Sequence, residues 1–494
     1  MASPTRSSRV PTAEELTLGI DLGTSSVKVV VADPGGAVRA VASAPYEVAS
    51  AHPGWAETRP GDWWQAVISA VRQATSGVPV AAIAGLGLSG QMHGLVLTAA
   101  SGDAVRAAIL HLDTRAHAYL DRYRALPDAA LDRLANPLSP NMAGPMLLWA
   151  AEHAAAEYAV ARWALQPKDW VRLQLTGEVA AEPSDASATL LYDVPGNCWD
   201  GDTVEALHLR PEMLPPVLES AGALAGRLSS AAAQALGLPV GVPVAAGGGD
   251  TAVAALGAGL MQAGDVQLTI GTSGQVITPL TSPSASIQTG THLYRTATPH
   301  GWYGMGAVLN GGLALNWVRQ VLGVDWPTLY AVASAPATDD DPYFLPHLTG
   351  ERTPYLDPHM RGAWTQLGLA TDRTRLLRSA LEGVACALGQ ALDALPGGAG
   401  TQPIRLAGGG TTSPAWRQLL ADVLTRPLRP VDLPDVSGRG AALLGAVAAG
   451  LIGFDDIGTR LAPALGELTS PRPELCDVFA RRRSGFADQV TRLR

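Results

Sequence analysis

The chain has 494 residues, of which 47% are hydrophobic and 16% charged, and its formal net charge is −9 at pH 7. This length exceeds a single ordinary core and predicts two or three domains, while the composition excludes a disordered chain. The negative charge argues against a protein that binds nucleic acid through its phosphates.

No pattern in the sequence predicts export or membrane insertion. The first 15 residues lack the apolar segment of a secretion signal, and the three cysteines have no spacing typical of disulfides or zinc. The longest uncharged apolar run, residues 441–454, is too short and too rich in glycine to cross a membrane. We therefore expect a cytoplasmic protein in which this run packs tightly against another helix.

Residues 16–36 predict a β-hairpin with a tip of small residues. Two β-branched runs flank Gly23, Thr24 and Ser25, and a Pro-Gly-Gly turn follows the second run. Such a tip presents backbone N–H groups and hydroxyls at one place, which suits phosphate oxygens. Most isolated triplets of this kind are ordinary turns.

Two charged residues accompany this tip. Asp21 lies within an otherwise apolar strand, where it is suited either to bind Mg²⁺ through water or to accept hydrogen bonds from the turn. Lys28 follows the tip by a few residues. It either reaches a terminal phosphate or is simply exposed on its strand.

Further along, the polar segment Gln91, Met92 and His93 lies between two strand-like runs. A polar group on a loop at a strand end is a suitable contact for a sugar. A lone histidine is nonetheless commonly a structural hydrogen-bonding residue, and this alternative stays open.

Asp250 is the candidate general base. It follows a buried strand and three glycines, and it precedes a helix of small residues over positions 251–260. A carboxylate at a helix N-terminus is stabilised as the anion and is ready to accept a hydroxyl proton in phosphoryl transfer. An N-cap role would satisfy the same pattern.

The pattern of the first half repeats in the second half. A second hairpin has the tip Gly271, Thr272 and Ser273, and a strand ending in three glycines follows at residues 405–410. We interpret this as two duplicated α/β domains, 16–258 and 259–494, facing each other across a ligand-binding cleft, with the larger insertion in the first.

Several helices are also predicted in the chain. Asp62 opens one, Asp372 caps another that runs to residue 395, and Ser413 caps a third with Pro414 in its first turn. The basic residues 481–483 are interpreted as a solvated helix face.

The absence of characteristic motifs excludes two classes of kinase. Lys28 and Lys168 are the only lysines, so the sequence contains no G-K-[ST] motif of a P-loop protein. The H-R-D and D-F-G elements of protein kinases are also absent from the sequence.

Taken together, the motifs resemble those of the FGGY carbohydrate kinases, and among them the members that phosphorylate xylulose. The resemblance extends from Leu18 to about Gly453. It is carried by the segments Ile20-Asp-Leu-Gly-Thr-Ser, Gln91-Met-His-Gly, Pro167-Lys-Asp-Trp, Ser184-Asp-Ala-Ser, Gly247-Gly-Gly-Asp, Gly271-Thr-Ser-Gly, Gly350-Glu-Arg-Thr-Pro and Gly408-Gly-Gly-Thr-Thr-Ser-Pro.

The resemblance implies an actin-like ATPase fold of duplicated ribonuclease-H-type domains, with ATP in the interdomain cleft and a pentulose as phosphate acceptor. It implies that Met92 and His93 contact the ketose and that Asp250 is the base. The full set of expected site residues is Gln91, Met92, His93, Asp113 and Thr251 for the sugar; Gly23 to Ser25, Lys28, Gly271 to Ser273, Gly408 to Gly410 and Ser413 for ATP; and Asp21 and Asp250 for Mg²⁺. A homodimer is left open.

The sequence departs from the xylulose-phosphorylating pattern in three segments. Thr251 stands where these members have Asn, His111-Leu112 replaces a Trp-Asn pair before Asp113, and Met146 replaces a lysine. Ribulose or another ketose or polyol therefore remains an alternative substrate. An actin-like sugar sensor that binds nucleotide without phosphorylating a sugar is the alternative from another class.

Overall fold

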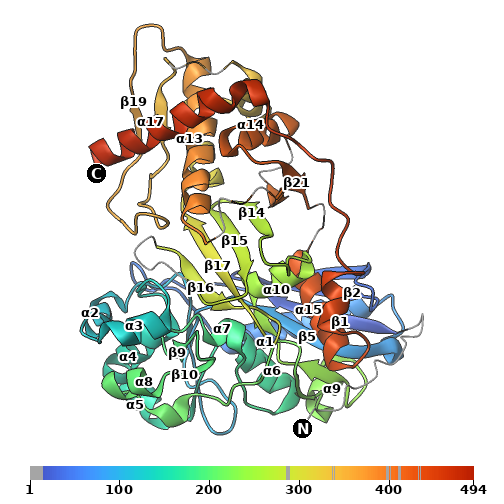
Figure 1. Ribbon diagram of the computed structural model, residues 1–494. Coiled ribbons are helices and arrows are strands. Elements are labelled where there is room, and N and C mark those ends of the chain that lie inside the picture. The colour runs from blue at the N-terminus through green and yellow to red at the C-terminus, as the bar shows by residue number, and fades with distance from the viewer. Residues whose placement is uncertain are drawn as a thin grey trace. The chain divides into compact units, whose positions relative to one another are not determined.

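The computed structural model divides the chain into two compact units, each described here by itself (Figure 1). Unit 1 comprises residues 1–261, 294–302 and 433–463, and unit 2 comprises residues 262–293, 303–432 and 464–494. The residues that the structure describes are 15–284, 290–336, 338, 340–396, 400, 402–409, 413–431, 433 and 435–494.

The centre of unit 1 is a seven-stranded sheet with the order β11-β12-β5-β1-β2-β3, in which β13 also pairs with β5. The predicted first hairpin is confirmed, because β1 and β2 pair antiparallel, and β5 then joins β1 in parallel. The strands are β1 (Leu16–Leu22), β2 (Ser26–Ala32), β3 (Val38–Pro45), β5 (Ile83–Gly90), β11 (Leu224–Arg227), β12 (Pro243–Ala245) and β13 (Gly248–Gly249).

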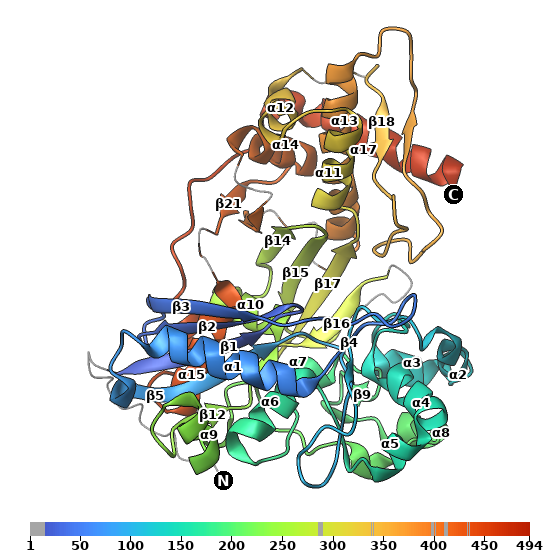
Figure 2. The ribbon, with the colours of Figure 1, turned by 180° about the vertical axis from the view of Figure 1, so that it is seen from behind.

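Helices cover both faces of this sheet. Helix α1 (Pro60–Thr75) packs on β2 and β3, and α15 (Val436–Ala448) packs on β5 and β1 from the opposite face (Figures 1 and 2). The predicted helix at Asp62 is therefore present, although it begins two residues earlier, with Pro60 in its first turn.

Helix α15 comes close to its neighbours because glycines lie at the contacts. A Cβ atom on Gly87 would lie 2.0 Å from the Ala441 oxygen, and one on Gly257 would lie 2.0 Å from the Val436 oxygen. Gly257 ends α10 (Asp250–Gly257), so α15 contacts this helix at Val436 and Gly440, just before the run 441–454 for which a helix contact was expected. The 441–454 run additionally packs on the sheet, which the sequence did not predict.

A second group of short elements in unit 1 surrounds its own core of buried side chains, including Met146 and Leu191. These elements are β4 (Glu57–Thr58), β6 (Val96–Thr98), β7 (Ala108–Ile109), α2 (Leu120–Arg124), α3 (Asp128–Leu134), α4 (Ala143–His153), α5 (Ala155–Val160), β8 (Trp163–Leu165), β9 (Tyr192–Asp193), β10 (Cys198–Trp199) and α8 (Gly201–Ala206). The other short elements of unit 1 are α6 (Pro167–Thr176) and α9 (Ser230–Leu236), which pack into the core of the sheet, and α7 (Pro183–Ala186) and α16 (Phe454–Gly458).

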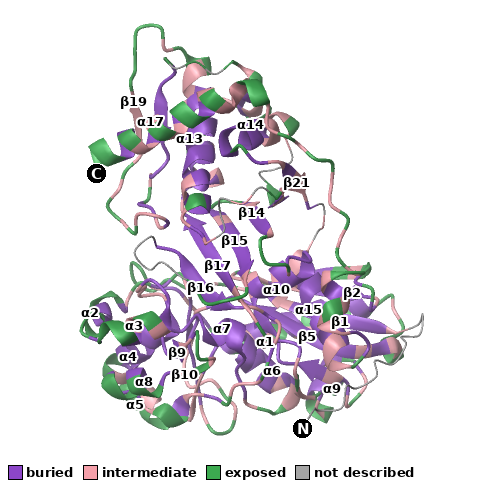
Figure 3. Ribbon diagram, in the orientation of Figure 1, coloured by how far each residue is buried: buried purple, intermediate pink, exposed green. Residues whose placement is uncertain are grey.

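Unit 2 is built on a six-stranded sheet with the order β16-β17-β15-β14-β20-β21. Its long helix α13 is largely buried, and Asp372 caps it as predicted by accepting a hydrogen bond from the Arg375 N–H at 2.9 Å (Figure 3). The main elements are β14 (Val266–Ile270), β15 (Gly274–Leu280), β16 (His292–Arg295), β17 (Trp302–Val308), α11 (Gly312–Val321), α12 (Trp326–Ala331), β18 (Tyr343–Leu345), β19 (Ala363–Thr365), α13 (Arg373–Asp393), β20 (Ile404–Ala407), α14 (Pro414–Leu424), β21 (Leu428–Pro430) and α17 (Cys476–Leu493).

The two sheets repeat one arrangement, although the glycine runs do not mark equivalent strands. In unit 1, β1 pairs antiparallel with β2 and parallel with β5; in unit 2, β14 pairs antiparallel with β15 and parallel with β20. The strand before Gly408 therefore matches β5, not β12 before Gly247. The two glycine runs are therefore not equivalent points for measuring an insertion. The equivalent strands nonetheless place a larger insertion in the first half, because β5 ends at Gly90 and β12 begins at Pro243, whereas β20 ends at Ala407 and β21 begins at Leu428.

The structure also corrects the interpretation of residues 481–483. Arg482 is 1% exposed, and its guanidinium donates hydrogen bonds to Glu382 and to the backbone oxygens of Asp341 and Pro342. Only its neighbours along the helix have access to solvent. Within the described residues, no helix combines the length and the hydropathy that a membrane span requires.

Candidate active site

Asp250 is the first residue of α10 and follows directly on β13, which pairs with the end of β5. Its Oδ1 accepts hydrogen bonds from the Thr251 N–H at 2.6 Å and from the Thr251 hydroxyl at 3.2 Å. The N-cap of α10 is Gly249 rather than Asp250. The carboxylate is thus held at a strand end by the next residue in the chain. Thr251, which was expected to contact the sugar, contacts the candidate base in this structure.

The electrostatic surroundings of Asp250 differ from the expectation of a readily ionised carboxyl. Burial, and after it the nearby charge of Asp21, raise the pKa of Asp250 to about 6 against the lowering effect of the Thr251 hydrogen bonds. Burial likewise raises the pKa of Asp21 above its usual value. Two carboxyls close together at a partly buried place disfavour double ionisation, and this outweighs the dipole of an eight-residue helix.

The carboxyl pair is a suitable donor set for a hard cation. Mg²⁺ is commonly held by one or two carboxylates together with substrate phosphates and waters, so it does not need a full protein cage. Within the described part of the chain, no cluster of three or more His, Cys, Asp or Glu side chains is present. Lys28, expected to reach a phosphate, forms an ion pair with Asp435 at the start of α15.

The Met92–His93 segment lies beside the strand end that carries Asp250. A Cβ atom on Gly249 would lie 2.9 Å from Met92 Cγ, so these two positions are in contact. His93 has a positive φ of 72°, and its Nδ1 lies 2.8 Å from the Ala188 oxygen. Because a carbonyl only accepts, Nδ1 carries the hydrogen, and Nε2 of the neutral ring is the acceptor.

The first glycine tip is supported from behind by two side chains. Gln91 donates through Nε2 to the Gly23 oxygen at 3.0 Å and to the Tyr46 hydroxyl at 3.2 Å, and that hydroxyl also donates to the Gly23 oxygen. Gln91 is 1% exposed. Its Nε2 therefore supports the tip, whereas its buried Oε1 forms no hydrogen bond with the described residues, and a sugar contact at Gln91 stays a prediction. Ser25 itself is exposed and Thr24 is partly exposed.

Two further positions expected near the sugar are buried. Asp113 is 1% exposed, and its carboxylate accepts hydrogen bonds from the Ala56 N–H and the Arg115 guanidinium, each at 2.7 Å. These bonds hold the Asp113 carboxylate inside unit 1, and a sugar contact at Asp113 stays a prediction. Met146 is fully buried in α4. The methionine that stands here in place of the lysine of related sequences is therefore part of the apolar core.

The second tip is supported by the start of α11. The Gly312 N–H donates to the Gly271 oxygen at 2.8 Å, and the Leu313 N–H donates to the Thr272 oxygen at 2.9 Å. A Cβ atom on Gly312 would lie 2.5 Å from the Gly271 oxygen. The predicted tip Gly271, Thr272 and Ser273 is exposed throughout, as a phosphate-binding tip requires.

A cavity of about 500 Å³ in unit 2 adjoins this tip. Its volume is in the range of small-molecule sites. Gly271, Thr272 and Gly409 from the predicted set line it, together with Asn316 and the stacked rings of Trp326 and Tyr330, whose centroids are 5.5 Å apart. The sequence analysis missed the last three, although the glycine pair 311–312 between a strand and a helix was a signal for this region.

The remaining predicted nucleotide contacts have different roles. Gly408 has a positive φ of 93°, and a Cβ atom there would lie 2.4 Å from the Ile270 oxygen, so this glycine permits close packing of two strand ends. Ser413 caps α14 by accepting a hydrogen bond from the Trp416 N–H at 3.4 Å. Gly410 lies outside the described residues.

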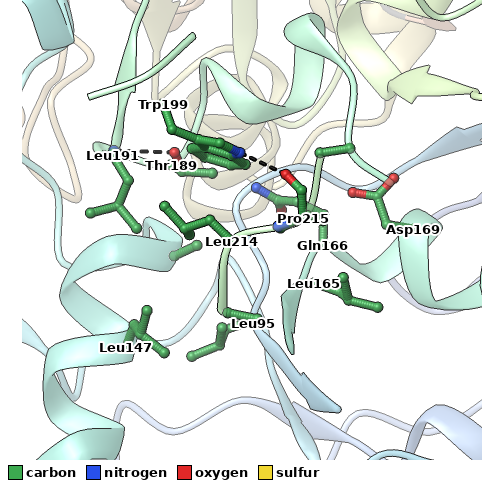
Figure 4. A pocket seen from close by; sticks show the side chains of 13 residues that line it. Leu95, Leu147, Leu165, Gln166, Asp169, Thr189, Leu191, Trp199, Leu214 and Pro215 are labelled. Carbon is green, nitrogen blue, oxygen red and sulfur yellow. Dashed lines mark hydrogen bonds between the residues drawn. The ribbon is translucent and has the colours of Figure 1, made fainter. Parts of the chain in front are cut away.

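A second cavity, in unit 1, is too small for a sugar. It measures about 20 Å³, room for roughly one water molecule. Figure 4 shows its mainly apolar lining, with Gln166 and Asp169 as polar members and with Trp199 bonded to the Pro215 oxygen.

Comparison with known proteins defines the class. A model of the N-terminal domain of the FGGY family of carbohydrate kinases matches residues 16–257, and a model of the C-terminal domain of that family matches residues 266–449. The two matches span most of a chain with two actin-like α/β units, as predicted, so the protein is a carbohydrate kinase. It belongs to the FGGY family.

Individual relatives resemble the chain over nearly its whole length. A xylulose kinase of Escherichia coli (strain K12) is 34% identical over 87% of this chain and 90% of its own length. A xylulose kinase of Staphylococcus epidermidis is 31% identical over 96% of each chain. The crystal structure named as a "xyloylose kinase" from Brucella ovis has a TM-score of 0.91 and 31% identity, covering 97% of this chain and 99% of the other.

Proposed function

We propose that the protein transfers the γ-phosphate of Mg-ATP to a hydroxyl of D-xylulose and forms D-xylulose 5-phosphate. The observation that carries the proposal is the placement of Asp250 at a strand end, next to Asp21 and to the contact between Gly249 and Met92. The resemblance to xylulose kinases over nearly the full chain supports the choice of sugar.

In this mechanism, Asp250 accepts the proton of the attacking hydroxyl. The new bond forms between that oxygen and the γ-phosphorus, the bond to the β-phosphate oxygen breaks, and ADP leaves. A carboxyl with a pKa of about 6 is mostly ionised at neutral pH and still takes up a proton readily. Asp21 and Asp250 would hold Mg²⁺, which supplies positive charge for the phosphate oxygens.

The two units divide the substrates between them in this proposal. Unit 1 would bind the sugar through Met92 and His93, with Nε2 of His93 accepting a hydrogen bond from a sugar hydroxyl. Unit 2 would bind the adenosine in the cavity beside Gly271 and the Trp326 ring. The first unit corresponds to the predicted domain 16–258 with residues 294–302 and 433–463 added.

A coupled assay of ADP release tests the proposal directly. D-xylulose, L-xylulose, D-ribulose, L-ribulose and glycerol would each be supplied with ATP and Mg²⁺, and a reaction without sugar serves as the control. We expect the highest kcat/KM with D-xylulose and almost no ADP without an acceptor. A preference for ribulose would refute the substrate, and equal ADP release with and without sugar would favour the nucleotide-dependent sensor.

A further inference from the structure

A buried cluster of charged side chains lies next to the strand that carries Asp250. The Lys168 ammonium lies 2.7 Å from Asp169, 3.5 Å from Glu182 and 3.3 Å from Asp185, and Arg172 lies 2.7 Å from Asp169. All five side chains are at most 1% exposed. Burying so many charges is costly unless they are paired, and each charged group here lies within 3.5 Å of a group of opposite charge.

The cluster contacts the strand end at two points. The Arg172 guanidinium donates to the Ala246 oxygen at 2.7 Å, four residues before the candidate base. The second point is Ser184, whose Oγ accepts a hydrogen bond from the Gly249 N–H at 3.1 Å. Gly249 immediately precedes Asp250, so this bond holds the peptide between Gly248 and Gly249, one peptide unit before that of Asp250.

Ser184 is itself fixed by the cluster. Its hydroxyl donates to Glu182 Oε1 at 2.8 Å, and its own N–H donates to Glu182 Oε2 at 2.9 Å. Glu182 caps α7 in this way and faces Lys168. A serine hydroxyl can donate once and accept at the same time, so it links the charged cluster to the Gly249 N–H in one directed chain.

The fit around this hydroxyl is close. Ser184 is fully buried, and a Cβ atom on Gly248 would lie 2.9 Å from its Oγ. The same short segment also holds the Ala188 oxygen, which accepts from His93. The segment from Ser184 to Ala188 therefore contacts both the backbone just before the candidate base and the ring of His93, the residue expected to bind the sugar.

We propose that Ser184 is a positioning residue for Asp250: it transmits the rigidity of the buried charged cluster to the catalytic strand end through the Gly249 N–H. This inference rests on the proposed function, in which Asp250 is the base. Without the hydroxyl, the Gly249 N–H loses its acceptor and Asp250 moves relative to the attacking oxygen. A misplacement of about 1 Å is enough to lower a rate by roughly 10²-fold.

The matched control is Ser187, which lies on the same segment. Ser187 is 2% exposed, and its Oγ accepts from the Arg295 N–H at 3.1 Å and donates to the Ser184 oxygen at 3.0 Å. Ser184→Ala and Ser187→Ala therefore remove the same number of buried hydrogen bonds. We expect similar losses in Tm for both, but a fall in kcat of about 10–100-fold for Ser184→Ala alone, with KM for ATP unchanged.

A double-mutant cycle with Asp250→Asn separates this inference from the proposed function. If Ser184 acts through Asp250, adding Ser184→Ala to Asp250→Asn should leave the residual kcat unchanged. A multiplicative fall in the double variant, or equal kcat values for Ser184→Ala and Ser187→Ala, would overturn the role of Ser184 alone. Full turnover of Asp250→Asn would instead overturn the assigned base.

A cysteine variant provides the test if Ser184→Ala does not fold. Ser184→Cys retains a side chain of similar shape, and its sulfur is a weaker hydrogen-bond acceptor. We expect kcat to fall several-fold with KM for ATP unchanged. Wild-type kcat in folded Ser184→Cys would overturn the proposal.

Discussion

The two glycine tips have the same scaffold but different supports. Each follows a strand that pairs antiparallel with its hairpin partner and parallel with a later strand. The first tip has its Gly23 oxygen held by the side chains of Gln91 and Tyr46. The second has its Gly271 oxygen held by a backbone N–H at the start of α11.

The decisive difference lies two residues before each tip. Asp21 occupies this position in unit 1, and Thr269 occupies the equivalent position in unit 2. The first position has a second carboxyl nearby, that of Asp250, and each of the two carboxyls has a raised pKa. A repeated scaffold thus carries a site suited to a cation and a proton at one tip, and an aromatic-lined cavity at the other.

Asp250→Asn should lower kcat more than any other substitution proposed at the two tips. Removal of a positioned base lowers kcat by roughly 10²–10⁴-fold, while ATP binding in unit 2 should remain nearly intact. Because the folded pKa of about 6 exceeds the usual 3.8, the ionised carboxylate destabilises the fold above pH 6. The variant should therefore have a higher Tm than the native protein at pH 8, and this gain should shrink towards pH 4.

Steady-state kinetics and thermal melts at several pH values measure both parts. Near-normal turnover would refute the base. A lower Tm for the variant at pH 8 would show that the carboxylate stabilises the fold.

Asp21→Asn tests the carboxyl pair. Losing one carboxylate should raise the Mg²⁺ concentration needed for half-maximal activity by about 10–100-fold. It also removes a charge that raises the pKa of Asp250, so the acid limb of kcat/KM should move to lower pH. Thr269→Val, at the equivalent position of unit 2, is the control and should change neither. Equal effects of the two substitutions would contradict the assigned difference between the tips.

Gly312→Ala tests the support of the second tip. The added methyl would lie 2.5 Å from the Gly271 oxygen and displace it. Overpacking costs about 1–3 kcal/mol, so KM for ATP should rise by about 10-fold, with KM for the sugar unchanged. Gly368→Ala is the control, since a Cβ atom there meets nothing within 4 Å. A rise in KM for the sugar instead of ATP would indicate that the second tip contacts the sugar.

Lys28 should give the smallest effect. Its partly exposed ion pair with Asp435 contributes about 0–1 kcal/mol to stability, so Lys28→Ala and Asp435→Asn should lower Tm by similar small amounts. KM for ATP should stay within about twofold in both, because the pair is partly exposed and weak. The two variants also remove opposite charges that act on Asp21, since Lys28 lowers its pKa and Asp435 raises it. A rise in KM for ATP in Lys28→Ala alone would indicate that Lys28 contacts a phosphate, as the sequence predicts.

The sequence by itself determined the features that depend on local pattern. Both hairpins, their small-residue tips and the caps at Asp372 and Ser413 follow from β-branched runs, glycines and short polar side chains. The pattern of a carboxylate directly after a buried strand and three glycines marks Asp250 as the candidate base. Ordered motifs along the chain were also sufficient to recognise the FGGY family.

Only the tertiary structure decided the features that depend on which segments meet. Residues 433–463 cluster with the first unit because the glycines of α15 permit its backbone to touch β5 and α10. The glycine-rich run predicts a close contact, but it does not identify the segments that are contacted. Gln91 and Asp113 have the same polar groups whether they face a sugar or a buried partner, so their sequence could not separate the two roles. The raised pKa of Asp250 likewise arises from Asp21 and from burial, which are properties of the folded chain.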